Sequence, residues 1–183
     1  MISIKGGKNM GDTLITIIAI GLAAVLMFVF PLMTMSDRTD DVSQLTVKTA
    51  TTEFVDDVRA TGKITPDKYG KFVQNITATG NTYDVEMEVK ILDENPGKKT
   101  TQVEREKIGE NVYYSIYTSQ IQEVLDQNKT YNLKEGDIVS VSVKNTNQTL
   151  SQQLKNFFYT VVGDSTYTIA AQHAGMVTST GNH

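Results

Sequence analysis

The sequence predicts an α+β protein in which a long N-terminal, transmembrane α-helix packs against a small antiparallel β-sheet head with additional short helices. Three observations predict this class. Residues 13–35 form an uncharged and mostly apolar run of 23 residues. Residues 36–60 contain neither glycine nor proline, and segments of period-two alternation then occur among segments with helical spacing.

The apolar run matches a membrane span. At about 1.5 Å of rise per residue, a helix of this length crosses the roughly 30 Å hydrocarbon core of a bilayer. A cleaved signal peptide is the alternative, but its apolar core is shorter and ends at small residues, whereas this run ends with Pro31, Met33 and Met35. We therefore expect residues 13–35 to be a retained transmembrane or filament-core helix.

Charges on either side of the run predict its orientation. Lys5 and Lys8 precede it, and it is followed by Asp37, Arg38, Asp40 and Asp41. By the positive-inside rule, residues 1–12 form a short cytoplasmic leader and residues 63–178 form an extracytoplasmic α+β head. The expected location is thus the cell membrane, crossed once with the N-terminus in the cytoplasm.

The helix is expected to continue beyond the membrane as an amphipathic segment over residues 36–62, which packs on the head. Its apolar side chains recur at helical spacing: Val47, Ala50, Phe54 and Val58. Gly62 supplies a stop for this helix. Pro31 removes one backbone hydrogen bond, so a kink or local unwinding is expected there.

The first half of the head is predicted from its periodicity. Thr65 and Pro66 open a short amphipathic helix that ends at Gly80. Residues 83–91 alternate apolar and charged side chains, which predicts a strand with one buried face, and a turn follows at 95–97. Residues 98–110 fit no element. Residues 113–126 begin ambiguously, and a helix is favoured over a strand because the tyrosine-rich start leads directly into a segment of helical spacing.

Three further elements complete the head. Residues 139–143 alternate valine with serine and predict a second strand. Thr149 and Gln152 form a capping-box pair that opens a strongly amphipathic helix, which ends before Gly163. A final strand is expected over residues 166–177, and residues 179–183 are expected to be a disordered tail.

Catalytic and ligand-binding signatures do not occur in the sequence. There is no cysteine, and His173 and His183 are the only histidines, so a metal or acid–base cluster has few candidates. A net charge of -4 and a pI near 5.2, without a clustered basic face, argue against a nucleic-acid partner. We expect neither an enzyme nor a protein that binds a cofactor, a metal or a small-molecule substrate.

The layout resembles the type IV pilin superfamily, most closely the minor pilins and pseudopilins of tight-adherence (Tad) systems. The resemblance rests on the leader segment 5–11 (Lys-Gly-Gly-Lys-Asn-Met-Gly), on the apolar helix with Pro31, and on the polar continuation with a small α+β head. It implies processing of the leader at Gly7 or Gly11. The glutamate that these pilins usually carry five residues after the cleavage point is replaced by Thr16 when counted from Gly11, and Asp12 is the acidic residue nearby.

This resemblance implies a pilin-like or pseudopilin-like structural subunit of an extracellular filament or secretion apparatus. Its expected partners are the membrane and other copies of itself or other pilin-like subunits. Small residues in the first half of the helix allow close helix approach, although an ordinary lipid-facing anchor explains them equally well. The expected helix–helix assembly face comprises Leu14, Ile17, Ile18, Gly21, Leu22, Val25, Phe28 and Pro31.

The alternative function is a single-pass, membrane-tethered binding or adhesion module outside the cytoplasm. Such a module needs an exposed binding surface on its head. The candidate is an aromatic patch of Tyr113, Tyr114 and Tyr117. Packing of these tyrosines in the core is the competing interpretation.

Overall fold

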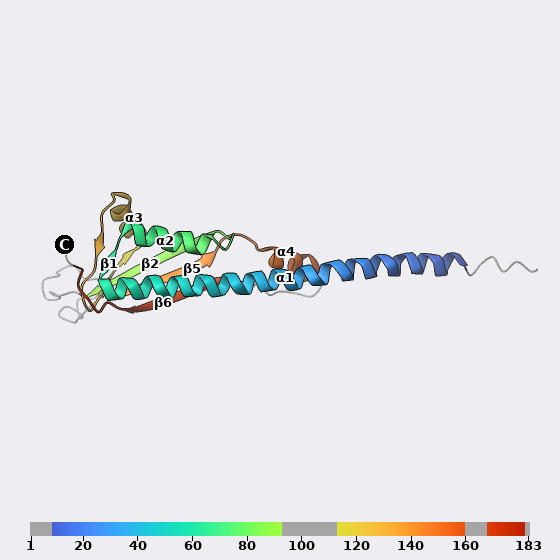
Figure 1. The fold of residues 1–183 in the computed structure, drawn as a ribbon, viewed down its shortest axis with the longest axis horizontal. Coiled ribbons are helices and arrows are strands. Elements are labelled where there is room, and N and C mark those ends of the chain that lie inside the picture. Colours follow the sequence, from blue (N-terminus) through green and yellow to red (C-terminus); the bar gives the residue numbers. More distant parts are fainter. Residues whose placement is uncertain (1–8, 93–112, 160–167, 182–183) are drawn as a thin grey trace, which may run out of the picture. The chain divides into compact units, whose positions relative to one another are not determined.

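The computed structural model describes residues 9–92, 113–159 and 168–181. Along the chain, the elements are α1 (Asn9–Thr61), β1 (Lys63–Ile64), α2 (Pro66–Thr77), β2 (Tyr83–Leu92), β3 (Tyr113–Tyr117), α3 (Thr118–Asp126), β4 (Tyr131–Asn132), β5 (Ile138–Asn145), α4 (Leu150–Tyr159) and β6 (Ala170–Met176) (Figure 1). They belong to two compact units. The stalk unit comprises Met1–Asp40 and Thr149–Asp164, and the head unit comprises Asp41–Gln148 and Ser165–His183.

The stalk unit contains the first part of α1 together with α4. Helix α1 continues without interruption through Pro31, so the local unwinding expected there is not observed. Helix α4 begins with the predicted capping box: the Thr149 N–H donates to Gln152 Oε1 at 3.0 Å, and the Gln152 N–H donates to Thr149 Oγ1 at 3.3 Å. These two bonds satisfy N–H groups that no helical carbonyl can reach.

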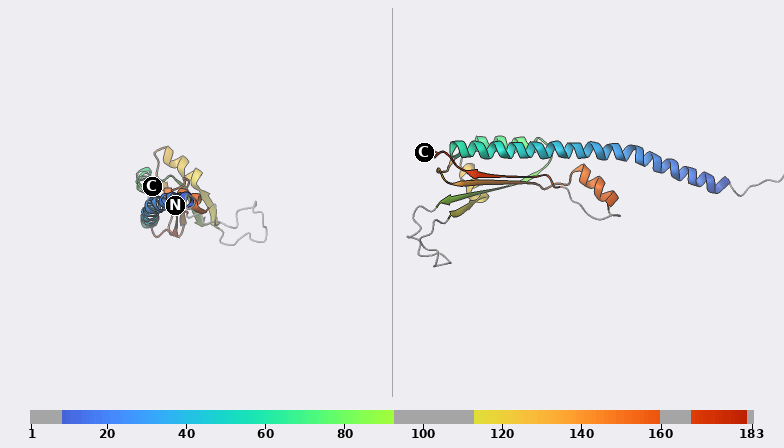
Figure 2. Two further views of the ribbon diagram at one scale, coloured as in Figure 1. Left: turned by 90° about the vertical axis from the view of Figure 1, so that its right-hand side faces the viewer. Right: turned by 90° about the horizontal axis from the view of Figure 1, so that it is seen from below.

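The head unit is built on an antiparallel sheet of four strands in the order β3–β2–β5–β6. The second part of α1 and helix α2 lie on one face of this sheet (Figures 1 and 2). The register pairs Met87 with Val141 and Val89 with Val139, so the apolar positions of both predicted strands point toward the helices. A separate two-stranded sheet joins β1 to β4.

The core of the head confirms the predicted helical stripe. All four residues of the stripe are buried, together with valines of β2 and β5: Val47, Ala50, Phe54 and Val58. Phe54 stacks on Phe72 of α2, with ring centroids 4.6 Å apart. The amphipathic continuation of α1 is therefore an integral part of the head.

Helix α1 ends where the sequence predicts, at Gly62. This residue adopts φ +62°, and a Cβ there would lie 2.2 Å from the carbonyl oxygen of Ser179, so only glycine fits. The same contact orders residues 179–181, which the sequence predicts to be a disordered tail. Gly181 is buried, and its N–H donates to the Leu133 carbonyl at 2.9 Å.

The start of the segment 113–126 differs from its prediction. Residues Tyr113–Tyr117 form strand β3, which pairs with Glu88–Leu92 of β2, and helix α3 begins only at Thr118. The Thr118 hydroxyl accepts a hydrogen bond from the Met87 N–H at 2.7 Å, which ends the strand pairing there. The prediction of a helix from Tyr113 was wrong because the strand depends on a partner distant in the sequence.

The outer edge of β6 is bonded to α1 at both of its ends. The Gln44 side-chain amide accepts from the N–H of Ala170 and donates to the carbonyl of the same residue. At the other end, Arg59 Nε donates to the Met176 carbonyl at 2.9 Å. Side chains of α1 thus occupy edge groups that a further strand would otherwise bond.

Candidate functional site

Most of the apolar part of α1 is uncovered by the rest of the described chain, and only Val29 and Met33 of residues 13–35 are half-buried. Thirteen large apolar side chains between Leu14 and Met35 are between 43% and 75% exposed. Among the residues that the structure describes, α1 is the one helix long and apolar enough to cross a membrane. An apolar surface of this extent needs lipid or another protein to cover it.

All eight residues of the expected assembly face are exposed. The opposite side of the helix is equally apolar and exposed, with Ile15 and Ile20 at 65% and 64%. A Cβ added at Gly21 would meet no atom within 4 Å, so the close approach that this glycine permits is unused within the chain. Which side of the helix a partner contacts therefore stays a prediction.

The two residues expected at a leader cleavage site are placed differently. Gly7 lies outside the described residues. Gly11 lies in the first turns of α1, is exposed, and has no neighbour within 4 Å of an added Cβ. Cleavage after either glycine therefore stays a prediction.

Threonine hydroxyls within the apolar part are satisfied by the helix itself. Thr16 Oγ1 donates to the Asp12 carbonyl at 2.7 Å, and Thr34 Oγ1 donates to the Phe30 carbonyl at 3.0 Å. A hydroxyl that bonds to the carbonyl four residues earlier can enter an apolar environment without an unpaired donor. These threonines are therefore compatible with a membrane span.

The N-terminal end of α4 is held against α1 just after the apolar run. Thr149 Oγ1 donates to Asp40 Oδ2 at 2.7 Å, and the Ser151 hydroxyl donates to Asp37 Oδ1. Asp40 is only 5% exposed. Two carboxylates beside a helix N-terminus also interact favourably with the partial positive charge of its free N–H groups.

Two large apolar side chains of α1 are exposed beyond the charged residues that follow the run. Val42 and Leu45 are 64% and 65% exposed, and both belong to the head unit. Their exposure was not predicted from the sequence, although their position off the stripe of Val47, Ala50 and Phe54 is a signal that identifies them. They are a candidate contact surface on the head unit.

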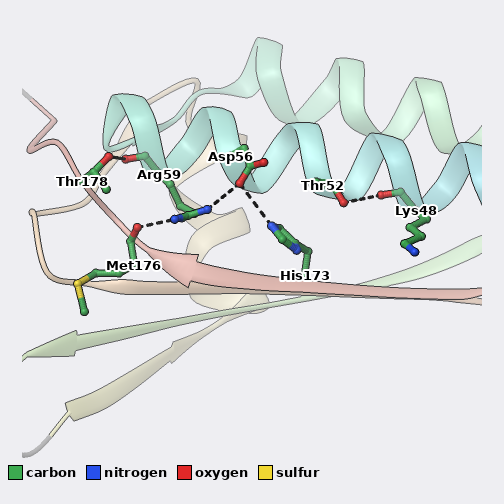
Figure 3. A network of polar contacts seen from close by, with 7 residues as sticks. All are labelled: Lys48, Thr52, Asp56, Arg59, His173, Met176 and Thr178. Carbon is green, nitrogen blue, oxygen red and sulfur yellow. Dashed lines mark hydrogen bonds and ion pairs between the residues drawn. The ribbon is translucent and has the colours of Figure 1, made fainter.

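A charged network joins α1 to β6 in the head (Figure 3). Asp56 Oδ1 lies 2.8 Å from Arg59 Nη1 and 3.3 Å from His173 Nε2. The hydrogen bond from Arg59, together with the hydrogen bond and charge of His173, holds the pKa of the Asp56 carboxyl below its ordinary value of 3.8, against an opposing effect of burial. Gly175 lies directly beneath Arg59, where an added Cβ would be 2.4 Å from Nε. His173 thus forms a contact between β6 and α1.

The face of the sheet away from α1 forms a polar groove of about 710 Å³. The groove is lined by Glu86, Glu88, Ser140 and Ser142. Tyr117 also lines it, and the Tyr117 residue is 58% exposed. Strand alternation puts Tyr113 and Tyr117 on this face and Tyr114 on the other. The three tyrosines therefore do not form the single patch that a helix would have allowed.

No group of three or more metal-binding side chains of His, Cys, Asp or Glu occurs among the described residues. The fold and these surfaces define an α+β protein with one N-terminal helix able to cross a membrane and a small sheet-containing head. No protein-family model, curated protein or solved structure matches this chain.

Proposed function

We propose that this protein is a non-enzymatic structural subunit, anchored in a membrane by α1 with its head on the exported side, that assembles through α1 into a pilin-like filament or secretion apparatus. The observation that carries the proposal is the exposure of the apolar helix at Leu14–Met35 in a chain whose head has a complete core of its own. The basic residues Lys5 and Lys8 before the apolar run support the orientation of α1 with its N-terminus in the cytoplasm, and the resemblance to pilins supports assembly of the pilin kind.

The membrane-spanning part alone does not distinguish a subunit from a simple anchor. Transfer of an apolar helix from lipid to a helix bundle removes no surface from water, so its association depends on close packing at small residues such as Gly21. Val42 and Leu45 do distinguish the two, because they lie after Asp37, Arg38 and Asp40, where water and not lipid would meet them.

Burial of these two side chains supplies a driving force for contact between subunits. Complete burial of a valine or leucine side chain contributes about 1.5–3 kcal/mol. Because Val42 and Leu45 are 64% and 65% exposed, each has most of this contribution still available. A contact on this side of α1 would therefore stabilise an assembly in water as well as in the membrane.

The test separates assembled from monomeric protein. Cells that express the full chain are sheared, and the released fibres and the membranes are examined by immunoblotting and electron microscopy. We expect the wild type in the sheared fraction and Val42→Glu as membrane-bound monomer. Gln74→Glu, which adds the same charge on exposed α2, is the matched control and should behave as the wild type. Recovery of the wild type only as a monomer in intact membranes would refute assembly.

N-terminal sequencing of the same native protein tests the leader. A start at Met1 indicates an unprocessed anchor, and a start directly after Gly7 or Gly11 indicates processing of the pilin kind. A start beyond Met35 would remove the helix on which the proposal depends.

The groove on the outer face of the sheet favours one second function, a membrane-tethered binding module. Tyr117 is the exposed aromatic side chain beside carboxylate and hydroxyl groups there. On this alternative, Tyr117→Ala reduces adherence of cells that express the protein and leaves its membrane content unchanged. Tyr114→Ala is the matched control, because Tyr114 is 43% exposed on the other face. Equal adherence of both variants and the wild type would exclude the groove as an adhesive surface.

A further inference from the structure

Three Asn-x-Thr sequences follow α1 in the chain, and they begin at Asn75, Asn128 and Asn147. Such a sequence is an acceptor for N-linked glycosylation where it lies on the surface of an exported protein. The modifying enzyme uses both ends of it, because the asparagine amide receives the sugar and the hydroxyl two residues later is recognised. The accessibility of these two groups therefore decides which of the three sequences can be modified.

The acceptor sequence at Asn75 lies in the last turn of helix α2, which ends at Thr77. Side chains two positions apart on a helix point to different sides, so Asn75 and Thr77 do not face one enzyme surface. The Thr77 hydroxyl also donates to the Val73 carbonyl at 2.8 Å. Modification of Asn75 would therefore require this end of α2 to unwind.

The polar groups of the acceptor sequence at Asn147 are already bonded. Asn147 Nδ2 donates to Asn81 Oδ1 at 3.0 Å, and Asn147 Oδ1 accepts from the Thr82 N–H at 2.9 Å. The last residue of the sequence, Thr149, is 5% exposed, and its hydroxyl donates to Asp40. Both ends of this sequence are therefore occupied in the folded chain.

The acceptor sequence at Asn128 has neither obstacle. Residues 127–130 connect α3, which ends at Asp126, to β4, which begins at Tyr131, and all four are exposed. Among the described residues, the side chains of Asn128 and Thr130 have no hydrogen-bond partner. The Asn128 amide and the Thr130 hydroxyl are therefore both accessible to an enzyme that approaches the head from solvent.

The backbone gives a competing reason for an asparagine at position 128. The Asn128 N–H donates to the Leu125 carbonyl at 2.8 Å, the Lys129 N–H donates to the Val124 carbonyl at 3.2 Å, and φ of Asn128 is +57°. Asparagine tolerates this left-handed conformation better than most residues, so the end of α3 explains it by itself. The end of the helix does not require a hydroxyl at Thr130, which completes the acceptor sequence.

The residues before the asparagine also differ among the three acceptor sequences. Asp126 is exposed and stands two positions before Asn128, whereas Val73 and Asn145 stand at this position in the other two sequences. Some oligosaccharyltransferases that act on exported proteins require an acidic side chain at this position. Only the sequence at Asn128 meets this requirement in addition to being accessible.

We propose that Asn128 is an N-glycosylation site on the head. The inference rests on the proposed orientation, because the transfer takes place on the exported side of the membrane. The sugar donor is an oligosaccharide whose anomeric carbon is bonded to a lipid phosphate. The Asn128 amide nitrogen forms a bond to this carbon and loses one proton. The bond from the carbon to the phosphate oxygen breaks, and the lipid phosphate leaves with the bonding electrons.

Mass spectrometry of the native protein tests this site. The full chain is purified from the cells that produce it, digested, and fragmented so that added sugar mass is assigned to a residue. We expect sugar on Asn128 and none on Asn75 or Asn147. Asn128→Gln and Thr130→Ala should each remove the sugar, whereas Thr130→Ser, which keeps the hydroxyl, should retain it. Asn75→Gln is the matched control and should leave the sugar unchanged.

Protease treatment of intact spheroplasts separates a failure of this inference from a failure of the proposed orientation. A head that is digested from outside while Asn128 carries no sugar would overturn the inference and leave the orientation intact. A head that is protected until the cells are lysed would overturn both. Sugar on Asn75 or Asn147 in place of Asn128, or sugar that persists in Thr130→Ala, would also overturn the inference.

Discussion

Phe54 and Leu45 lie on the same helix with opposite surroundings. Phe54 is 6% exposed and packs against Phe72 and Tyr69, whereas Leu45 is 65% exposed. We expect Phe54→Ala to lower the free energy of unfolding of the head by about 3–5 kcal/mol, because the variant loses the buried ring and leaves a cavity. Leu45→Ala should change it by less than about 0.5 kcal/mol, as is usual for a surface substitution.

Tyrosine fluorescence measures this difference selectively. All eight tyrosines follow α1 in the sequence, and the chain has no tryptophan, so the apolar helix contributes no signal. The full chain in detergent micelles is unfolded with urea or heat. For a domain of this size, the loss expected for Phe54→Ala corresponds to a decrease in Tm on the order of 10 °C.

The two variants together test which side of α1 packs on the head. Equal losses of stability in Phe54→Ala and Leu45→Ala would refute the assignment of the buried side, and no loss in either would show that α1 is not part of the head core. Leu45→Ala should instead reduce the yield of sheared fibres, because its surface is the one left for a neighbouring subunit.

Three other substitutions probe the contacts between α1, β6 and the C-terminal residues, all measured by the same unfolding assay. Gly175→Ala should lower the free energy of unfolding by about 1–3 kcal/mol, because the new Cβ displaces the Arg59 side chain. Gly70→Ala, in open space on α2, should instead raise it by about 0.5–1 kcal/mol. Gly62→Ala should lower the free energy of unfolding by more than about 2 kcal/mol, because φ at this position is positive and the Ser179 carbonyl oxygen would lie 2.2 Å from the new Cβ. A smaller loss would mean that residues 179–181 are not held there. Because the pKa of Asp56 is lowered on folding, its carboxylate stabilises the head above its unfolded pKa, and this contribution is lost as the pH falls through the lower folded value. The difference in urea midpoint between wild type and Asp56→Asn should therefore shrink as the pH falls below about 4, and a difference independent of pH would contradict this.

The sequence predicted those elements whose two faces differ chemically. Residues 83–91 and 139–143 alternate strictly, and the stripe from Val47 to Val58 has helical spacing, so each pattern fits one kind of structure. Tyr113–Tyr117 lacks such a pattern, because tyrosine suits either a half-buried strand or a helix surface. Its conformation depends on pairing with β2, about 25 residues earlier in the sequence, which no local pattern reveals.

The apolar helix that forms the candidate site was predictable from the sequence, but the side of the helix that a partner would contact was not. The apolar run of α1 is hydrophobic on all sides, so its sequence has no preferred side to identify, and the structure of a single chain leaves most of its surface exposed on every side. The hydrogen bonds of Asp37 and Asp40 to α4 were also missed. They join residues more than 100 positions apart in the sequence and depend on how the chain returns to α1.

The bonding of Gln44 and Arg59 to the border of the sheet has a consequence for crowded conditions. Side-by-side subunits meet at very high local concentration, where any unpaired strand invites irreversible cross-β association. With the backbone at Ala170 and the Met176 carbonyl already taken by α1, an incoming strand would find too short a stretch of free backbone to form a stable ladder. This edge of the sheet is thereby protected against strand addition, and the assembly proposed through α1 would not need it.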